Sequence, residues 1–465
     1  MTFSTVNRDD LKAFIEWFGG NNVLTGDTID EEYAHDELKT VHRRPDALLK
    51  ATDEAAIRRL LAYANERGIP VTVRGSGTGL VGACVPVEGG VVLDMTPMNK
   101  ILDLDKDNLT LDVEPGVLLL DIAEHVEKEG LFYAPDPGEK TATIGGNIAT
   151  NAGGMRAVKY GVTRDWVLGL RVVLADGTAM DLGGKVVKNS SGYSLKDLIV
   201  GSEGTLAVIV KATLKLIPAP AKAISLLMPF SSREAALVAA PKLIAHTTLP
   251  TAVEFMEQDM WKYSESFLGK NIPHDEHAAY LLATYDATTE GAVDEIVECA
   301  SAFAVDKLDA HDVYLIDTDD RKQSVWNARG AFLEAVKAST TEIDECDVVL
   351  PRSQLPGYLS FIQDLSESTD LRIPYFGHVG DGNLHIYLCR DDLDEATWKE
   401  KTAIAFDAMY EEAAKCQGLV SGEHGIGYAK KTYLRRHSDA RQLELMEAVK
   451  TAFDPKGILN PKKIL

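Results

Sequence analysis

The stretch Thr141-Ala-Thr-Ile-Gly-Gly-Asn-Ile-Ala-Thr-Asn-Ala-Gly-Gly154 combines glycines with small polar side chains. Two further glycine-rich segments flank it, Arg74-Gly-Ser-Gly-Thr-Gly79 upstream and Gly201-Ser-Glu-Gly-Thr205 downstream. Closely spaced glycines allow backbone N–H groups to approach a phosphate without a clash from Cβ atoms. The three segments together predict loops that wrap a long, flat, phosphate-bearing ligand.

The spacing in the first segment argues against a dinucleotide-binding fold, in which G-x-G-x-x-G opens a helix. Here the glycines follow the pattern G-x-G-x-G, and Gly82 and Pro86 are unfavourable in a first helix. A nicotinamide-binding crevice is therefore not expected. Taken alone, the loop is equally consistent with a glycine-rich turn that binds no ligand.

Length and charge limit the function classes. A chain of 465 residues, 45% of them hydrophobic, favours two or three domains with a sizeable core. The formal net charge of −23 repels nucleic acid and anionic lipid, so neither is expected as a partner. An anionic substrate would need local positive charge from an arginine, a metal or backbone N–H groups.

The cysteines and the hydrophobic runs bear on location. The five cysteines contain no Cys-x-x-Cys pair, which argues against a zinc ribbon or an iron–sulfur cluster and predicts reduced thiols in the cytoplasm. The start of the chain turns acidic at once, and no run of about 18 apolar residues occurs. We therefore expect neither a signal peptide nor a transmembrane helix.

Periodicity predicts a chain of mixed α and β structure. Pro218-Ala-Pro220 indicates a domain boundary, and the alternation of helices and strands beyond it indicates an α+β domain with an antiparallel sheet. Helices are predicted over residues 9–18, 52–68, 118–129, 232–246, 289–306 and 444–453, and in the run that follows Arg329. Strands are predicted over residues 69–73, 109–113, 170–175, 178–182, 208–217, 279–285 and 312–316, with Asp176-Gly177 as a hairpin turn.

A group of histidines carries the sharpest chemical signal. His378 precedes a Gly-Asp-Gly turn and His385 lies in the strand expected after it, while Glu423 and His424 sit among glycines. Neutral imidazoles with a carboxylate form an ordinary ligand set for Zn²⁺ or Fe²⁺. The alternative is a pair of buried structural histidines beside a tight turn. A metallohydrolase that activates water is a further reading, but it leaves the glycine segments unexplained.

Taken in order, these segments resemble the FAD-binding domain of the vanillyl-alcohol-oxidase superfamily. More closely, they resemble its branch of D-lactate, D-2-hydroxyglutarate and glycolate dehydrogenases, from about residue 40 to the end of the chain. The resemblance implies an α+β fold with a two-subdomain FAD-binding domain and an antiparallel-sheet substrate and metal-binding cap domain. It implies the FAD-binding domain at 1–220, the cap at 221–425 and a returning C-terminal segment at 426–465.

The resemblance also implies which residues bind FAD. The first loop would hold the pyrophosphate, the second would line the flavin and ribityl chain, and the C-terminal Asn460 would return to the flavin. No histidine occurs in residues 74–82 or 135–161, so we expect FAD to be non-covalent and Cys84 to be structural. The expected cofactor-binding residues are Arg74, Gly75, Ser76, Gly77, Thr78, Gly79, Pro135, Asp136, Pro137, Thr143, Gly145, Gly146, Asn147, Asn151, Gly153, Gly154, Ser202, Glu203, Thr205, Ile209 and Asn460.

For the chemistry, the resemblance implies that His378, His385 and Glu423 bind a divalent metal, Zn or Fe. His424 would contact the substrate and act as the base that takes its hydroxyl proton. Arg329, in Trp326-Asn-Ala-Arg329, would bind the substrate carboxylate through a bidentate guanidinium. The reaction expected is oxidation of a 2-hydroxy acid, with hydride transfer to flavin N5.

The substrate and the electron acceptor are narrower expectations. Leu333, Glu345 and Tyr387 stand where the hydroxyglutarate type carries extra polar or basic residues, which favours a short monocarboxylate such as D-lactate. Glycolate or D-2-hydroxyglutarate dehydrogenase, and a non-catalytic flavin-binding subunit, are the alternatives. The acidic run 341–351 resembles bacterial members that partner electron-transfer flavoprotein, so that protein or another redox subunit is the expected acceptor.

Overall fold

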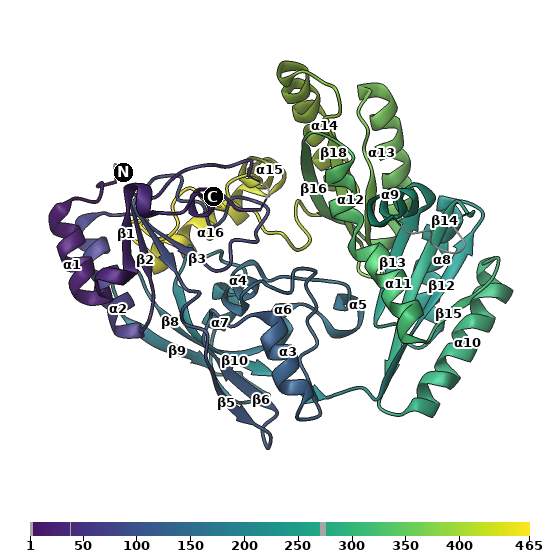
Figure 1. The fold of residues 1–465 in the computed structure, drawn as a ribbon, viewed down its shortest axis with the longest axis horizontal. Coiled ribbons are helices and arrows are strands. Elements are labelled where there is room, and N and C mark those ends of the chain that lie inside the picture. The colour runs from purple at the N-terminus through teal and green to yellow at the C-terminus, as the bar shows by residue number, and fades with distance from the viewer. Residues whose placement is uncertain (1–2, 38, 270–275) are drawn as a thin grey trace. The chain divides into compact units, whose positions relative to one another are not determined.

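The computed structural model describes residues 3–37, 39–269 and 276–465 (Figure 1). Contacts within the chain define two compact units. Unit 1 comprises Met1–Ala152, Val162–Pro218 and Glu423–Leu465, and unit 2 comprises Gly153–Gly161 and Ala219–Gly422. The short segment Gly153–Gly161 falls in unit 2 because its helix α5 (Ala157–Tyr160) packs on strand β13 (Ala252–Glu257), and Tyr160 donates a hydrogen bond to Asp286.

The first sheet of unit 1 has the strand order β1-β2-β4-β3. Strands β2, β4 and β3 are parallel, and β1 pairs antiparallel with β2. Helix α2 (Glu54–Arg67) begins at Asp53, whose side chain accepts the Ala56 N–H, and ends at Gly68 in the left-handed conformation, as predicted. The core joins α1 (Arg8–Phe18) and α2 to β1 (Val23–Thr25), β2 (Ala47–Lys50), β3 (Val71–Arg74) and β4 (Val91–Asp94).

The second sheet of unit 1 is antiparallel, with the order β5-β6-β10-β8-β9. The predicted hairpin at Asp176-Gly177 is present, because Gly177 adopts a φ of 82° and Asp176 accepts the Thr178 N–H. Its strands are β5 (Ile101–Asp105), β6 (Thr110–Val113), β8 (Val167–Val173), β9 (Ala179–Gly183) and β10 (Val208–Lys215). A separate pair joins β7 (Leu131–Phe132) to β11 (Ile217–Pro218).

Short helices fill much of the remaining chain of unit 1. The second glycine-rich segment, expected to be a loop, forms helix α4 (Ile144–Thr150), because Thr143 caps it and Ile144 and Ile148 lie buried one turn apart. The prediction for 118–129 was too long at its C-terminal end, and that for 444–453 began too late. The other helices are α3 (Leu119–Glu127), α6 (Thr163–Trp166), α7 (Leu195–Ile199), α15 (Lys431–His437) and α16 (Ala440–Phe453).

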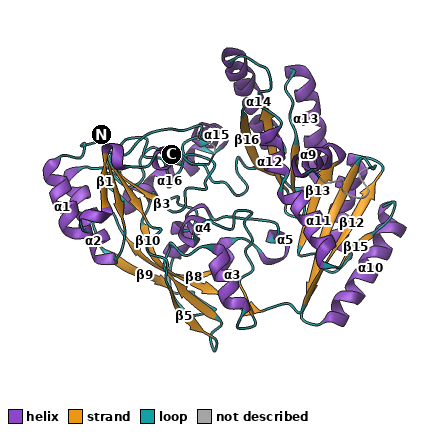
Figure 2. Ribbon diagram, in the orientation of Figure 1, coloured by secondary structure: helices purple, strands orange, loops and turns teal. Residues whose placement is uncertain are grey.

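Unit 2 is built on a seven-stranded antiparallel sheet of order β15-β12-β14-β13-β17-β18-β16, drawn in orange in Figure 2. Besides β13, its strands are β12 (Lys222–Phe230), β14 (Ala279–Ala287), β15 (Tyr314–Ile316), β16 (Ile343–Val349), β17 (Tyr375–His378) and β18 (Asn383–Cys389). The antiparallel α+β organisation predicted for this part of the chain is therefore confirmed.

Helices cover this sheet in two groups. The first group is α8 (Arg233–His246), α10 (Glu290–Leu308), α13 (Leu355–Thr369) and α14 (Glu395–Lys415). The second group is α9 (Gln258–Leu268), α11 (Asp319–Gly330) and α12 (Phe332–Ala338), which pack together and against β13. The helical run expected after Arg329 is thus broken at Ala331 into two helices.

The acidic run 341–351 is not a solvated face. Most of it forms β16, where Cys346 and Asp347 are fully buried and Glu345 is 5% exposed. Helix α14 packs on one face of β16, and on the other face Asp347 accepts hydrogen bonds from Ser421, Gly422 and Asn383. This run therefore does not itself offer an exposed acidic surface to an electron-transfer partner. Among the described residues, no helix is long and apolar enough to cross a membrane.

Candidate functional site

The three glycine-rich segments converge within unit 1. Residues 75–82 leave β3 without opening a helix, so the interpretation that rejected a dinucleotide-binding fold is confirmed. Ser76 donates to the Thr141 carbonyl, and a Cβ on Gly75 would collide with Thr143, which brings the first segment against the second. The N–H groups of Gly201 and Glu203 donate to Ile148 and Ala149 in α4, which joins the third segment to the second.

Asn460 fastens the C-terminal segment to the same place. Its side-chain amide donates to the carbonyl oxygens of Ala83 and Glu203, at 2.8 and 2.7 Å. Its backbone, at a φ of 42°, donates to the Val71 carbonyl beside β3. Residue 460 therefore lies where the first and third segments meet.

These residues suit a phosphate-bearing cofactor because several of their polar groups make no hydrogen bond to the described protein. Within the described residues, the N–H groups of Gly75 to Gly79 donate to no protein acceptor, so they remain open to an anion. Asn147 is 5% exposed, and no described group bonds its side-chain amide nitrogen. Buried amides are nearly always bonded, so an orphan here indicates a missing partner.

Arg74 has a different role from the one expected for its side chain. The guanidinium donates to the carbonyl oxygens of His35 and Glu32, both at 2.8 Å, and lies over the Tyr33 ring. It also contacts the Cys84 sulfur at 3.1 Å, and burial raises the pKa of that thiol. Arg74 thus holds the preceding chain in place, and the backbone N–H groups of the loop are left for an anion.

Several other expected cofactor residues shape the loops. Thr143 caps α4, Asn151 ends it in the left-handed conformation and accepts the Arg164 N–H, and Thr205 bonds the Ser202 carbonyl. Four more are buried, namely Pro135, Pro137, Ser202 and Ile209. Asp136 forms an ion pair with Lys140, Gly145 packs on Pro115, and the Gly146 N–H donates to the Thr143 hydroxyl. Gly153 and Gly154 are the first residues of the segment that belongs to unit 2.

In unit 2, the register gathers polar side chains on one face of the sheet. Phe255 opposes Gly377, His378 opposes Asn383, and His385 opposes Asp347. Because paired residues of an antiparallel sheet share a face, and alternate residues along a strand also do, Glu254, His378, Asn383, His385 and Asp347 point to the same side. Met256 and Phe376 share this face and pack against α9, α11 and α12.

Glu254 lies at the centre of this polar face and is fully buried. One carboxylate oxygen contacts His378 Nδ1 at 2.7 Å, and the other accepts from Arg329 Nε and Nη2 at 2.9 and 2.6 Å. Burial alone would raise the pKa of Glu254, but His378 and Arg329 hold this pKa below its usual value. The side chain is therefore an ionised bridge between an imidazole and a guanidinium.

Arg329 is itself 7% exposed and rigidly held. Its guanidinium carbon lies 4.6 Å from the Phe376 ring centre and 5.5 Å from that of Phe332. Cation–π contacts of this kind orient the plane of the guanidinium. In the part of the chain that the structure describes, Nη1 is bonded to no acceptor, so one edge of Arg329 remains open to a carboxylate.

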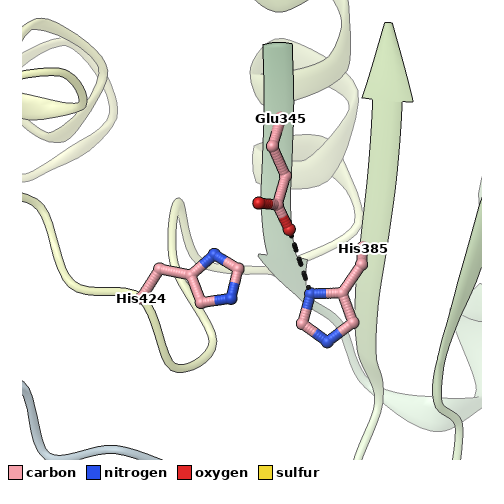
Figure 3. A group of neighbouring side chains, drawn as sticks. All are labelled: Glu345, His385 and His424. Carbon is pink, nitrogen blue, oxygen red and sulfur yellow. Dashed lines mark ion pairs between the residues drawn. The ribbon is translucent and has the colours of Figure 1, made fainter. Parts of the chain in front are cut away.

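His385 lies beside His378, with ring centres 5.2 Å apart and planes at 85°. Figure 3 shows the ion pair between His385 on β18 and Glu345 on β16, which spans 3.3 Å from Nδ1 to Oε1. From the sequence, Glu345 was named only among the residues that differ from the hydroxyglutarate type. The structure instead gives this buried carboxylate an imidazole as its neighbour.

Asp347 fixes the start of the segment that carries Glu423 and His424. Its carboxylate accepts from the Ser421 hydroxyl at 2.7 Å, the Gly422 N–H at 3.0 Å and the Asn383 amide at 2.6 Å. Gly422 is the last residue of unit 2, so Glu423 follows directly upon this anchor. His424 is also labelled in Figure 3, and its Nε2 lies 3.8 Å from Oε1 of Glu423.

Glu203 fixes the end of the same segment within unit 1. Its two carboxylate oxygens accept the N–H groups of Ile426 and Gly427, each at 2.7 Å. Burial raises the pKa of Glu203 to about 7, against the opposing effect of these two bonds. The Glu203 side chain thus holds the segment 425–427 in place.

Sequence reasoning missed Glu254, Asp347 and Asn383. Only Glu254 stands inside an apolar stretch, Ala252-Val-Glu-Phe-Met256, and that pattern was the available signal, whereas Asp347 lies in an acidic run and Asn383 begins its strand. A buried carboxylate requires a partner, so an acidic residue in such a strand predicts an ion pair. The partner itself lies on another element and cannot be identified from the pattern.

Comparisons with known proteins agree with this architecture. The family described as FAD binding domain matches residues 45–183, and the family described as FAD linked oxidases, C-terminal domain, matches residues 219–464. The chain is 47% identical to a D-lactate dehydrogenase of Anaerostipes hadrus, over 99% of this chain and 98% of the relative. It is 38% identical to the glycolate oxidase subunit GlcD of Bacillus subtilis, over 99% and 97%.

A solved structure of p-cresol methylhydroxylase with substrate bound superposes with a TM-score of 0.79 at 17% identity, over 99% of this chain and 98% of that one. The predicted fold, an FAD-binding domain of the vanillyl-alcohol-oxidase type with an α+β second domain, is thereby confirmed. The three converging segments with Asn460 form the cradle of unit 1, of which residues 74–79 and 141–154 lie within the matched FAD binding domain. Residues 201–205 lie between the two matched ranges, and Asn460 and the polar face of unit 2 lie within the C-terminal domain. The chain therefore belongs to the family of FAD-linked oxidases, and it is an FAD-dependent dehydrogenase.

Proposed function

We propose that this chain oxidises a short D-2-hydroxy acid, D-lactate to pyruvate. The observation that carries the proposal is the placement of an arginine and a histidine on one buried carboxylate of unit 2, in a chain that also has an FAD-binding domain. A 2-hydroxy acid presents a carboxylate and a hydroxyl on neighbouring carbons, which suits this pair. The similarity to a D-lactate dehydrogenase over nearly the whole chain supports the same substrate.

In this proposal, each group of the chain has a distinct task. Arg329 binds the substrate carboxylate through its open edge, because a planar guanidinium matches a carboxylate. His424 takes the hydroxyl proton as the general base. FAD, when bound, supplies the acceptor of the C2 hydride. Glu203 and Asp347 keep the segment around His424 in place through their backbone contacts.

We further propose that His378, His385 and Glu423 bind a divalent metal, Zn or Fe. Each side chain offers one ligand atom of a type that these metals accept, as do Glu345 and His424. Because Glu254 occupies Nδ1 of His378, Nε2 of that ring is the nitrogen proposed to bind the metal. The ion, when bound, would act as a Lewis acid on the substrate hydroxyl.

FAD is proposed to bind without a covalent link. The loops that converge in unit 1, residues 74–82 and 135–161, contain no histidine, and the nearby Cys84 sulfur is engaged by Arg74. Electrons are proposed to leave through electron-transfer flavoprotein or another redox subunit. The surface that such a partner would use is not the buried run 341–351.

Glycolate and D-2-hydroxyglutarate are the competing substrates, and the former has support from the similarity to a glycolate oxidase subunit. The surroundings of Arg329 favour a monocarboxylate. Tyr387 stacks on Phe376, and Leu333 packs against the same apolar cluster. Leu333 offers no hydrogen-bond donor and Tyr387 no positive charge, so neither side chain would neutralise the second carboxylate of a diacid.

An anaerobic substrate panel tests the proposed function. The purified flavoprotein is mixed with D-lactate, L-lactate, glycolate or D-2-hydroxyglutarate, and loss of the oxidised flavin absorbance is followed. We expect D-lactate to bleach the flavin fastest. Faster bleaching by glycolate or by D-2-hydroxyglutarate would assign the alternative substrate, and a flavin inert to all four would refute a hydroxyacid dehydrogenase.

A further inference from the structure

Glu254 is a buried charged residue of unit 2 to which the proposed reaction assigns no task. It lies on β13, is fully buried, and has a separate partner for each carboxylate oxygen. Removing two charges and an imidazole from water is costly unless the contacts are well formed. A buried bridge of this kind is weak evidence for stability, which directs attention to a functional reason for it.

The contact with His378 determines which ring nitrogen carries the proton. Arg329 donates from both Nε and Nη2 to one oxygen of Glu254, which is the geometry of a carboxylate that accepts, and we therefore assign Nδ1 of His378 as the donor in the 2.7 Å contact with the other oxygen. The lone pair of Nε2 then points away from Glu254, as a ligand atom must. Carboxylate partners of this type fix the tautomer and the ring orientation of metal-binding histidines.

The contact with Arg329 determines which edge of the guanidinium is free. Nε and Nη2 both bond the same oxygen, and the two phenylalanine rings hold the plane. The Nη1 side is left for a ligand. Since His378 and Arg329 bind opposite oxygens of one carboxylate, Glu254 sets the separation between the imidazole and the guanidinium.

We infer that Glu254 is a positioning residue that holds a metal-binding imidazole and a carboxylate-binding guanidinium at a fixed short separation. The inference rests on the proposed function for the identity of the ligands. The placement of both groups on a single carboxylate suits a substrate whose hydroxyl and carboxylate stand on neighbouring carbons. It disfavours substrates in which these two groups are further apart.

The test compares Glu254→Gln with Glu257→Gln. Glu257 lies on the same strand, contacts Tyr375 at 2.7 Å and Arg233 at 3.4 Å, and faces the opposite side of the sheet. It is thus a second carboxylate with an arginine and a ring partner, outside the proposed site. A glutamine amide at position 254 can accept from one partner but must present an N–H₂ group to the other. The same change at position 257 disturbs an equivalent cluster elsewhere.

Two readouts are measured on the flavin-loaded protein: affinity for Zn²⁺ by equilibrium dialysis, and kcat and KM for D-lactate. We expect Glu254→Gln to retain FAD, to bind Zn²⁺ about 10- to 100-fold more weakly and to raise KM. Glu257→Gln should keep both values near wild type. If Glu254→Gln does not fold, Glu254→Asp keeps the charge but reaches one partner only, and it should show the same loss to a smaller degree.

Equal Zn²⁺ affinity and KM in the two glutamine variants would overturn the inference, as would a wild-type protein that takes up no Zn²⁺. A wild-type protein that binds Zn²⁺ but oxidises no hydroxy acid would refute the proposed function instead. In that case the Zn²⁺ affinity of Glu254→Gln relative to Glu257→Gln still decides the role of Glu254.

Discussion

Unit 1 and unit 2 build their candidate binding surfaces from different parts of the polypeptide. In unit 1, the converging segments offer mainly backbone N–H groups, and side chains such as Arg74 and Glu203 are used to hold the loops. In unit 2, the polar face consists of side chains from several strands and a helix, each positioned by a buried charge. The comparison shows that small residues make the backbone of the first surface accessible, whereas ion pairs and hydrogen bonds with buried charged groups position the side chains of the second.

The largest effect expected from this comparison is a loss of reaction rate in a variant that still binds FAD. His424→Ala removes the proposed base while the cradle of unit 1 is untouched, so FAD content should stay near wild type. The rate of anaerobic flavin bleaching by D-lactate should fall by roughly 10²- to 10⁴-fold. The exposed His311 on unit 2 provides the control, since His311→Ala should bleach normally. Bleaching of His424→Ala at the wild-type rate would remove this residue from the role of base.

The second effect concerns the backbone-built surface. Gly77 has a φ of 81°, and a Cβ there would collide with the Arg74 guanidinium, so Gly77→Ala is strained twice. We expect a loss of about 2–5 kcal/mol in the free energy of unfolding and a lower FAD content. Gly138→Ala is the matched control, because its Cβ meets open space. Flavin absorbance per chain and chemical denaturation measure both changes. Equal FAD content in the two variants would contradict a cradle made of closely approaching backbone.

The smallest effect is the pH dependence of the free energy of unfolding that comes from Glu203, which holds the segment 425–427. The pKa of Glu203 is raised by burial from 4.5 to about 7, so the folded chain binds this proton more tightly than the unfolded chain. Its contribution to stability is therefore complete below about pH 4.5 and declines as the pH rises to about 7, by roughly 3 kcal/mol. Denaturation across this range, with wild type and Glu203→Gln compared, isolates the slope. Above about pH 7, the free energy of unfolding should change with pH equally in the two proteins. Equal changes between pH 4.5 and 7 would show that Glu203 has an ordinary pKa.

Much of the fold could be predicted from local patterns. Helix α2 was predicted within residues 52–68, and the β8–β9 hairpin was predicted from Asp176-Gly177. Such signals act between residues close in the chain, so they survive without tertiary context. Helix α4 was missed because glycines weigh against helix propensity, and its stability comes from the burial of Ile144 and Ile148.

The candidate site divides in the same way. His378, His385 and Arg329 could be singled out because their flanking residues form a recognisable pattern, and the structure assembles these three side chains within unit 2. Glu254 could not be assigned, since it is 124 residues from His378 and 75 from Arg329 along the chain. Only strand register and helix packing decide that one carboxylate meets both.

The sequence by itself determined the family, the glycine-rich segments and the types of side chain available for catalysis, because these appear in short contiguous patterns. The tertiary structure alone decided that Arg74 supports a loop, that the run 341–351 is a buried strand, and that Glu254 bridges two binding groups. The physical reason is the cost of burying a charge: it forces each buried ionised group to find a partner, and the fold, not the neighbouring sequence, determines which partner lies within reach.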